Sequence, residues 1–159
     1  MRLADMINPY NCGPSSIVAA YEDVFNGDPT SDIVGLARYE EAVFLIVKGA
    51  GATGTATITI EACDDVTPSN STAIAFRYKV CTSGNTWGSW ATATTAGFTT
   101  TAGANQAYMI SVAPEDLTEG YDYVRMDCTE VVDSPCDGAI LVILGNPRYS
   151  QDVQLEAIT

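Results

Sequence analysis

The sequence predicts an all-β protein: an antiparallel β-sandwich or jelly-roll-like barrel of about 7–8 strands with an irregular N-terminal arm. From residue 42 onward, short runs in which apolar and polar residues alternate are separated by turn-forming sequences. The loops TPSNST, TSGNT and TTAGAN are rich in residues that tolerate tight or left-handed backbone conformations. No long helical pattern interrupts these runs, so we expect short antiparallel strands throughout.

The expected strands follow one another along the chain. In the run TATITIEAC (55–63), Ile58 and Ile60 share one face and the threonines share the other, which is typical of a sheet with one wet face. We expect GAGATG (49–54) to form a hairpin turn rather than a nucleotide-binding loop, because it joins two strands. A second hairpin is expected to turn at DSPCD. The predicted strands are 42–48, 55–63, 73–81, 87–94, 107–113, 122–131, 139–145 and 153–158.

The first 40 residues lack this alternation, so we divide the chain into an N-terminal arm and irregular segment (1–40) and a β-sandwich domain (41–159). Proline, glycine and asparagine punctuate the arm, yet it holds too many apolar side chains for a free tail. We therefore expect the arm to lie across the sheets or across a neighbouring subunit. The candidate contact residues are Met6, Ile7, Pro9, Tyr10, Ile17, Tyr21 and Phe25.

Composition limits the classes of partner. A chain of 159 residues is long enough to bury the core of one domain. It carries 7 basic and 20 acidic residues, a net charge of −13, which argues against binding nucleic acid or an anionic membrane surface. The N-terminal sequence has no signal-peptide-like apolar run, and AVFLIV (42–47) and AILVIL (139–144) are too short to span a bilayer. We expect synthesis in a cytoplasm.

The cysteines are predicted to be reduced. Their number is odd and no pair has the C-x-x-C spacing, so neither a disulfide framework nor a zinc site is indicated. In a hairpin turning at DSPCD, Cys136 lies in the turn and Cys128 faces a different residue, so these two are not cross-strand partners. The five cysteines are Cys12, Cys63, Cys81, Cys128 and Cys136.

The sequence offers little for catalysis. It contains no histidine, which excludes Ser-His-Asp and Cys-His chemistry and removes the commonest ligand of zinc. The carboxylates, including Glu61, Asp64 and Asp65 at the end of TATITIEACDD, belong to no recognised glycosidase or EF-hand motif. We read them as the polar end of a strand, and expect no catalytic residues, no metal and no cofactor.

Two tryptophans in TWGSW are candidates for a surface aromatic contact. Trp87 and Trp90 are three residues apart, so on a strand they would face opposite sides, one in the core and the other exposed or at an interface. An exposed tryptophan suits either a subunit contact or a stacking platform for sugars.

Residues 36–150 contain a loosely spaced series: the apolar run FLIV, the strand TITIEACDD, a tryptophan segment, an acidic turn leading into GYDYVR, and an apolar strand closing in NPRY. This order resembles that of the small structural proteins that decorate or stabilise the heads of tailed bacteriophages. Residues 1–35 carry none of it.

The resemblance implies a non-catalytic protein on the capsid exterior, made in the host cytoplasm. It implies homotrimers that clamp adjacent subunits of the major capsid protein, with the arm residues as capsid or subunit contacts. Two other classes stay open. One is a carbohydrate-binding or adhesin-like β-sandwich, and the other is a neck or tail component of a virion.

Overall fold

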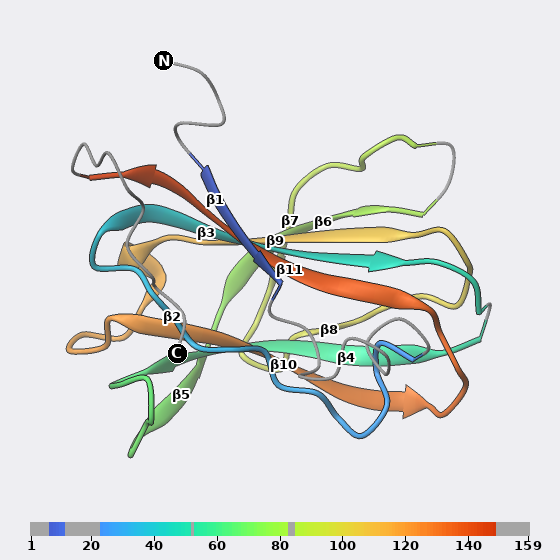
Figure 1. Cartoon of the computed structure of the whole chain (residues 1–159), viewed down its shortest axis with the longest axis horizontal. Helices are drawn as coiled ribbons and strands as arrows, with labels where there is room; N and C mark the ends of the chain where they lie inside the picture. The colour runs from blue at the N-terminus through green and yellow to red at the C-terminus, as the bar shows by residue number, and fades with distance from the viewer. Residues whose placement is uncertain (1–6, 12–22, 52, 83–84, 149–159) are drawn as a thin grey trace.

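The computed structural model describes residues 7–11, 23–51, 53–82 and 85–148, and it confirms the predicted all-β class (Figure 1). Two antiparallel sheets pack face to face, and the sheets form the upper and lower layers of the view in Figure 1. Within the described residues, a single 3-10 turn, η2 (Pro114–Asp116), is the only named helical element. It forms within the APEDL sequence and begins at Pro114, as expected for a proline in a first helical position.

The six-stranded sheet has the strand order β1-β11-β3-β9-β6-β7. All of its neighbouring strands are antiparallel. Its members are β1 (Ile7–Asn11), β3 (Tyr39–Lys48), β6 (Phe76–Cys81), β7 (Ala91–Ala93), β9 (Ala107–Val112) and β11 (Gly138–Pro147).

The five-stranded sheet has the order β2-β10-β4-β5, and β8 pairs with β4 beside this path. Without β7, β8 and β9, the two sheets read β1-β11-β3-β6 and β2-β10-β4-β5, which is the strand order of a jelly roll. Strand β9 is inserted between β3 and β6. The members of this sheet are β2 (Val34–Gly35), β4 (Thr55–Cys63), β5 (Ser71–Ile74), β8 (Phe98–Thr99) and β10 (Tyr123–Val132).

The core lies between the two sheets and follows the alternation of the strands. In β4, Ile58 and Ile60 are fully buried, while Thr57 and Thr59 are only partly buried on the other side. Strand side chains alternate between faces, so each strand contributes every second residue to the core. Fully buried residues from both sheets include Phe44, Ile46, Ile58, Ile60, Ile110, Val124, Met126, Val142 and Leu144.

Both expected hairpins are wrong, because each of these turns carries the chain from one sheet to the other. Strand β3 belongs to the six-stranded sheet and β4 to the five-stranded sheet, and β10 and β11 are separated in the same way. The two crossing segments touch: a Cβ on Gly51, which has φ +99°, would overlap the carbonyl oxygen of Pro135. The glycines of GAGATG therefore serve this close approach of two backbones.

Two of the expected strands differ most from the structure. The run 73–81 is split at Ala75, where the chain leaves β5 in one sheet and enters β6 in the other. The run 87–94 contains only the short strand β7. Strands β1, β2 and β8 were not predicted, and the expected strand 153–158 lies outside the described residues.

Residues 23–40 contribute side chains to the sandwich core. Val24 and Phe25 are fully buried, and the Val24 N–H donates to the Cys136 carbonyl at 2.8 Å. Val34 in β2 is fully buried as well. Phe25 was a candidate for a capsid or subunit contact, but its side chain is fully buried in the core of its own chain and is not available for such a contact.

The four cysteines within the described residues, Cys63, Cys81, Cys128 and Cys136, are all buried. Burial raises the pKa of the Cys63 and Cys136 thiols, which keeps them protonated near neutral pH. In the part of the chain that the structure describes, no helix has the length and apolar character of a membrane span.

Candidate functional site

The side of the six-stranded sheet that points away from the core is apolar along its middle strands. In β3, Val43, Leu45 and Val47 alternate with fully buried Phe44 and Ile46, so they point outward. Residues that are paired across antiparallel strands point to the same side. Val43 pairs with Ile143, and Leu45 pairs with both Leu141 and Met109. We call Val43, Leu45, Val47, Met109, Leu141 and Ile143 the outer face.

The outer face is only partly covered within the single chain. Val47 is 39% exposed, and the other five side chains are half-buried. Strands that are apolar on both sides are typical of strands buried on both sides, whereas a solvated sheet face is polar. The continuous apolar runs AVFLIV and AILVIL carried this signal in the sequence; they were predicted to be strands and too short to span a bilayer, but burial of both of their sides was not predicted. Apolar side chains gathered on an outward-facing side of a sheet make this face the candidate contact surface.

The two tryptophans extend the outer face past β6. The Lys79 ammonium lies 5.3 Å from the ring centroid of Trp87 and 4.9 Å from that of Trp90. The Arg77 guanidinium lies 4.9 Å from the Trp90 centroid. Lys79 pairs with Met109 across β6 and β9, so this cation–aromatic group adjoins the outer face directly.

The prediction that the tryptophans face opposite sides, with one in the core, is wrong. Both are exposed, Trp87 by 36% and Trp90 by 43%, and both rings lie against the same lysine. The physical reason is that residues 87–90 precede β7 and do not belong to a strand, so the alternation rule does not apply to them.

Two of the described basic side chains border the outer face. Lys48 is buried, and Arg125 is engaged by Glu61 through an ion pair of 2.6 Å. Among those left, Arg77 and Lys79 flank the outer face along β6, and Arg148 follows the end of β11. The outer face therefore has two cations along its β6 side, while Glu41 lies on the same side of β3, two residues before Val43.

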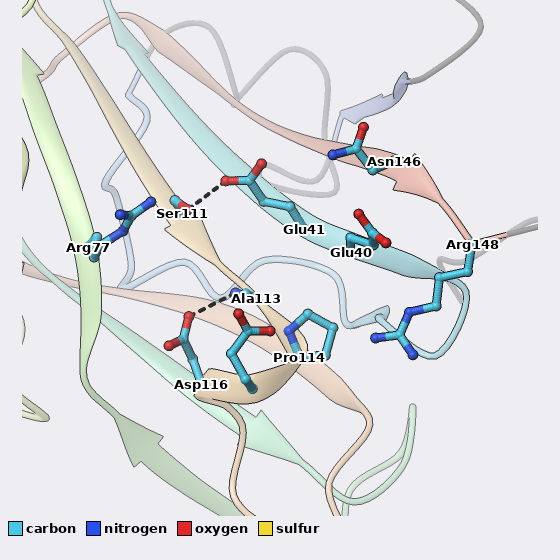
Figure 2. A pocket seen from close by; sticks show the side chains of 10 residues that line it. Glu40, Glu41, Arg77, Ser111, Ala113, Pro114, Asp116, Asn146 and Arg148 are labelled. Atoms are coloured by element: carbon cyan, nitrogen blue, oxygen red, sulfur yellow. Dashed lines mark hydrogen bonds between the residues drawn. The ribbon is translucent and has the colours of Figure 1, made fainter.

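A polar groove of about 590 Å³ lies at the end of the six-stranded sheet (Figure 2). Ser111 donates to the Glu41 carboxylate at 2.6 Å, and the Ala113 N–H donates to Asp116 at 2.9 Å, so two of its carboxylates hold local structure. The groove contains arginines and carboxylates together, which suits a charged segment of a protein partner. Its lining includes Glu40, Glu41, Arg77, Glu115, Asp116 and Arg148.

The carboxylates that attracted attention in TATITIEACDD have structural roles. Glu61 accepts hydrogen bonds from Arg125 Nε at 3.1 Å and Nη2 at 2.6 Å. Asp64 closes the loop between β4 and β5, because its Oδ1 accepts from the N–H groups of Ser69 and Asn70 and its Oδ2 from the Asn70 side chain. The side-chain hydrogen bond from Asn70 is the main cause that lowers the Asp64 pKa.

Other titratable groups also hold the fold together. Lys48 Nζ donates to the carbonyls of Gly54 at 2.9 Å and Thr101 at 3.0 Å, and burial lowers its pKa. On the five-stranded sheet, burial raises the pKa of Asp127, whose Oδ1 is buried without a hydrogen-bond partner. Among the described residues, no group of three or more histidines, cysteines or carboxylates is arranged to hold a metal ion.

A second exposed apolar spot lies at the end of β10. Val131 is 56% exposed and Val132 is 43% exposed, at a β-bulge between Glu130 and Val132. Asp28 accepts a hydrogen bond from the Glu130 N–H at 2.6 Å. Burial, followed by the charges of Asp133, Asp23 and Asp28, raises the pKa of Glu130. We call Val131, Val132 and the surrounding Asp28, Glu130 and Asp133 the β10 tip; in the sequence its signal is EVVD, two valines between acids.

The predicted arm contacts are only partly described. Ile7, Pro9 and Tyr10 lie in β1, which pairs with β11 along the edge of the six-stranded sheet. Met6, Ile17 and Tyr21 lie outside the described residues.

Comparisons with protein families, with curated proteins and with solved structures found no match for this chain. Its function is therefore argued from its surfaces and from the sequence resemblance alone.

Proposed function

We propose that this protein is a non-catalytic structural component of a tailed-phage head, which binds the capsid exterior and stabilises contacts between subunits of the major capsid protein. The outer face is the observation that carries this proposal. Its six apolar side chains, continued by Trp87 and Trp90, form a protein-contact surface on a small acidic sandwich. The order of sequence features that resembles head-decoration proteins supplies the biological setting.

The charge of the molecule supports a position outside the capsid. A net charge of −13 disfavours contact with packaged DNA, which requires clustered cations. The described carboxylates and cations that interact most closely, such as Glu61 with Arg125, hold the fold itself together. The role we propose requires rigid surfaces, and two packed sheets supply them.

A carbohydrate-binding role is less well supported. That role favours exposed tryptophans beside carboxylates, since sugars are held by stacking together with hydrogen-bond acceptors. Here Trp87 and Trp90 lie beside Arg77 and Lys79. Such a cation–aromatic group is frequent at protein interfaces, where tryptophan and arginine are enriched.

The test uses heads of the phage that encodes the chain, prepared from a strain in which its gene is deleted. The purified protein is added back, and binding is measured by co-sedimentation with the heads and by their resistance to heat. We expect saturable binding and greater resistance. Heads that neither bind the protein nor gain stability would refute the proposal.

A further inference from the structure

We propose that the outer face binds the β10 tip of a second copy of this chain, so that the subunits associate head to tail. This inference rests on the proposed function only in treating the outer face as a protein-contact surface. It names the occupant of that surface, and it can be tested on the purified chain without any capsid.

The exposed large apolar side chains of the described residues fall into two groups. Val47, Trp87 and Trp90 belong to or adjoin the outer face, and Val131 and Val132 form the β10 tip. The outer face lies on the six-stranded sheet, whereas β10 belongs to the five-stranded sheet in the other layer (Figure 1). One molecule therefore cannot cover its own outer face with its own tip, but a neighbour can.

The β6 side of the outer face and the β10 tip carry opposite charges. Arg77 and Lys79 flank the outer face along β6. At the β10 tip, Asp133 and Asp28 accompany the valines and Glu130; burial raises the pKa of Glu130, and the charges of Asp133, Asp23 and Asp28 add to this rise. Apolar centres with opposite charges around them are the arrangement that favours and orients association.

Charge also selects head-to-tail association over the symmetric alternatives. Two outer faces packed against each other would bring together the Arg77 and Lys79 side chains of both copies. Two β10 tips would bring together the carboxylates around Glu130. Only the unlike pairing joins basic with acidic borders. Contacts of this kind close into rings when the rotation between subunits permits, which agrees with the trimer that the sequence resemblance implies.

The experiment uses two variants that each disable one surface. The face variant is R77E/K79E, and the tip variant is V131D, which places a charge in the apolar centre of the tip. Each variant is checked for folding by circular dichroism and thermal melting. Association is measured by sedimentation velocity over a concentration series, from nanomolar to tens of micromolar. Matched controls are Arg38→Glu, an exposed cation before the start of β3 and away from β6 and the tryptophans, and Thr129→Asp, an exposed site on β10 two residues before Val131.

We expect the wild type and both controls to form an oligomer larger than a dimer, and each surface variant alone to sediment as a monomer. An equimolar mixture of the two variants should form a dimer, because the intact tip of the face variant meets the intact face of the tip variant. The second possible contact joins the altered face of one variant to the altered tip of the other, so it does not form and the dimer does not grow. We expect the dissociation constant of each single variant to rise at least tenfold.

A mixture that remains monomeric while the wild type associates would overturn head-to-tail pairing. A wild type that stays monomeric throughout the series would overturn self-association by this surface. Oligomers of wild-type size formed by each of the two variants on its own would also overturn it. If the wild-type protein is monomeric and still binds phage heads, the proposed function stands and this inference fails. If it forms the head-to-tail oligomer and does not bind heads, this inference stands and the proposed function fails.

Discussion

Leu45 and Ile46 are neighbours on β3 with opposite environments, and truncating each to alanine separates stability from association. Ile46 is fully buried in the core, while Leu45 is half-buried on the outer face. Removing a fully buried isoleucine leaves a cavity and costs about 2–5 kcal/mol of unfolding free energy. For a dilute, monomeric chain we expect Leu45→Ala to cost less, about 1–2 kcal/mol, since part of its side chain still contacts water.

The same two substitutions should have the opposite order of effect on association. If Leu45 becomes fully buried in the interface, its loss removes about 50 Å² of apolar contact, or about 1 kcal/mol, and raises the dissociation constant about fivefold to tenfold. Ile46 does not reach the outer face, so Ile46→Ala should leave the dissociation constant of the folded protein nearly unchanged.

Urea denaturation at low concentration measures the first quantity, and sedimentation velocity below the unfolding transition measures the second. An equal loss of unfolding free energy for Leu45→Ala and Ile46→Ala in the dilute chain would contradict the assignment of Leu45 to an association surface. Such a result would mean that the outer face is part of the fold of the single chain and is not a surface kept for a partner.

Three further predictions concern the fold. Lys48→Met should lower the unfolding free energy by about 2–4 kcal/mol in urea denaturation at pH 7, because the carbonyls of Gly54 and Thr101 lose their buried donor; an unchanged midpoint would contradict this. Gly51→Ala should lower the midpoint of thermal unfolding by several degrees, through the positive φ and the overlap with Pro135, while an equal midpoint would show that the loops move apart freely. Asp127 has a folded pKa raised above its unfolded value of about 3.9, so the stability it contributes below that pH is lost as pH rises through the folded pKa. In urea titrations from pH 4 to 7, Asp127→Asn should therefore flatten this loss; a parallel pH dependence in both proteins would exclude Asp127 as its source.

Period-two alternation located the strands, but it did not assign them to sheets. The strand 55–63 has the predicted limits, because Ile58 and Ile60 must be buried together and the turn sequences bound them. Alternation states which side of a strand is buried and not which strand lies beside it. The hairpins expected at 49–54 and at DSPCD were therefore assumptions about neighbours, and the chain crosses between sheets at both.

The candidate site was less accessible from the sequence, because it depends on strands that are distant along the chain. Leu45, Met109 and Leu141 become neighbours only through the pairing of β3 with β9 and β11. The tryptophans were identified as contact candidates, but their shared position over Lys79 follows from a loop path that no period describes. Val131 and Val132 of EVVD lie at the β-bulge in β10, which the sequence pattern does not predict, so their exposure could not be read from the sequence.

In the proposed assembly, the outer face is a surface for protein association, bound by the β10 tip of a neighbour. Sedimentation velocity of an equimolar mixture of R77E/K79E and V131D tests this claim most directly. We expect the mixture to form a dimer, although each variant is monomeric on its own. A mixture that sediments as monomer, under conditions in which the wild type is an oligomer, would contradict it.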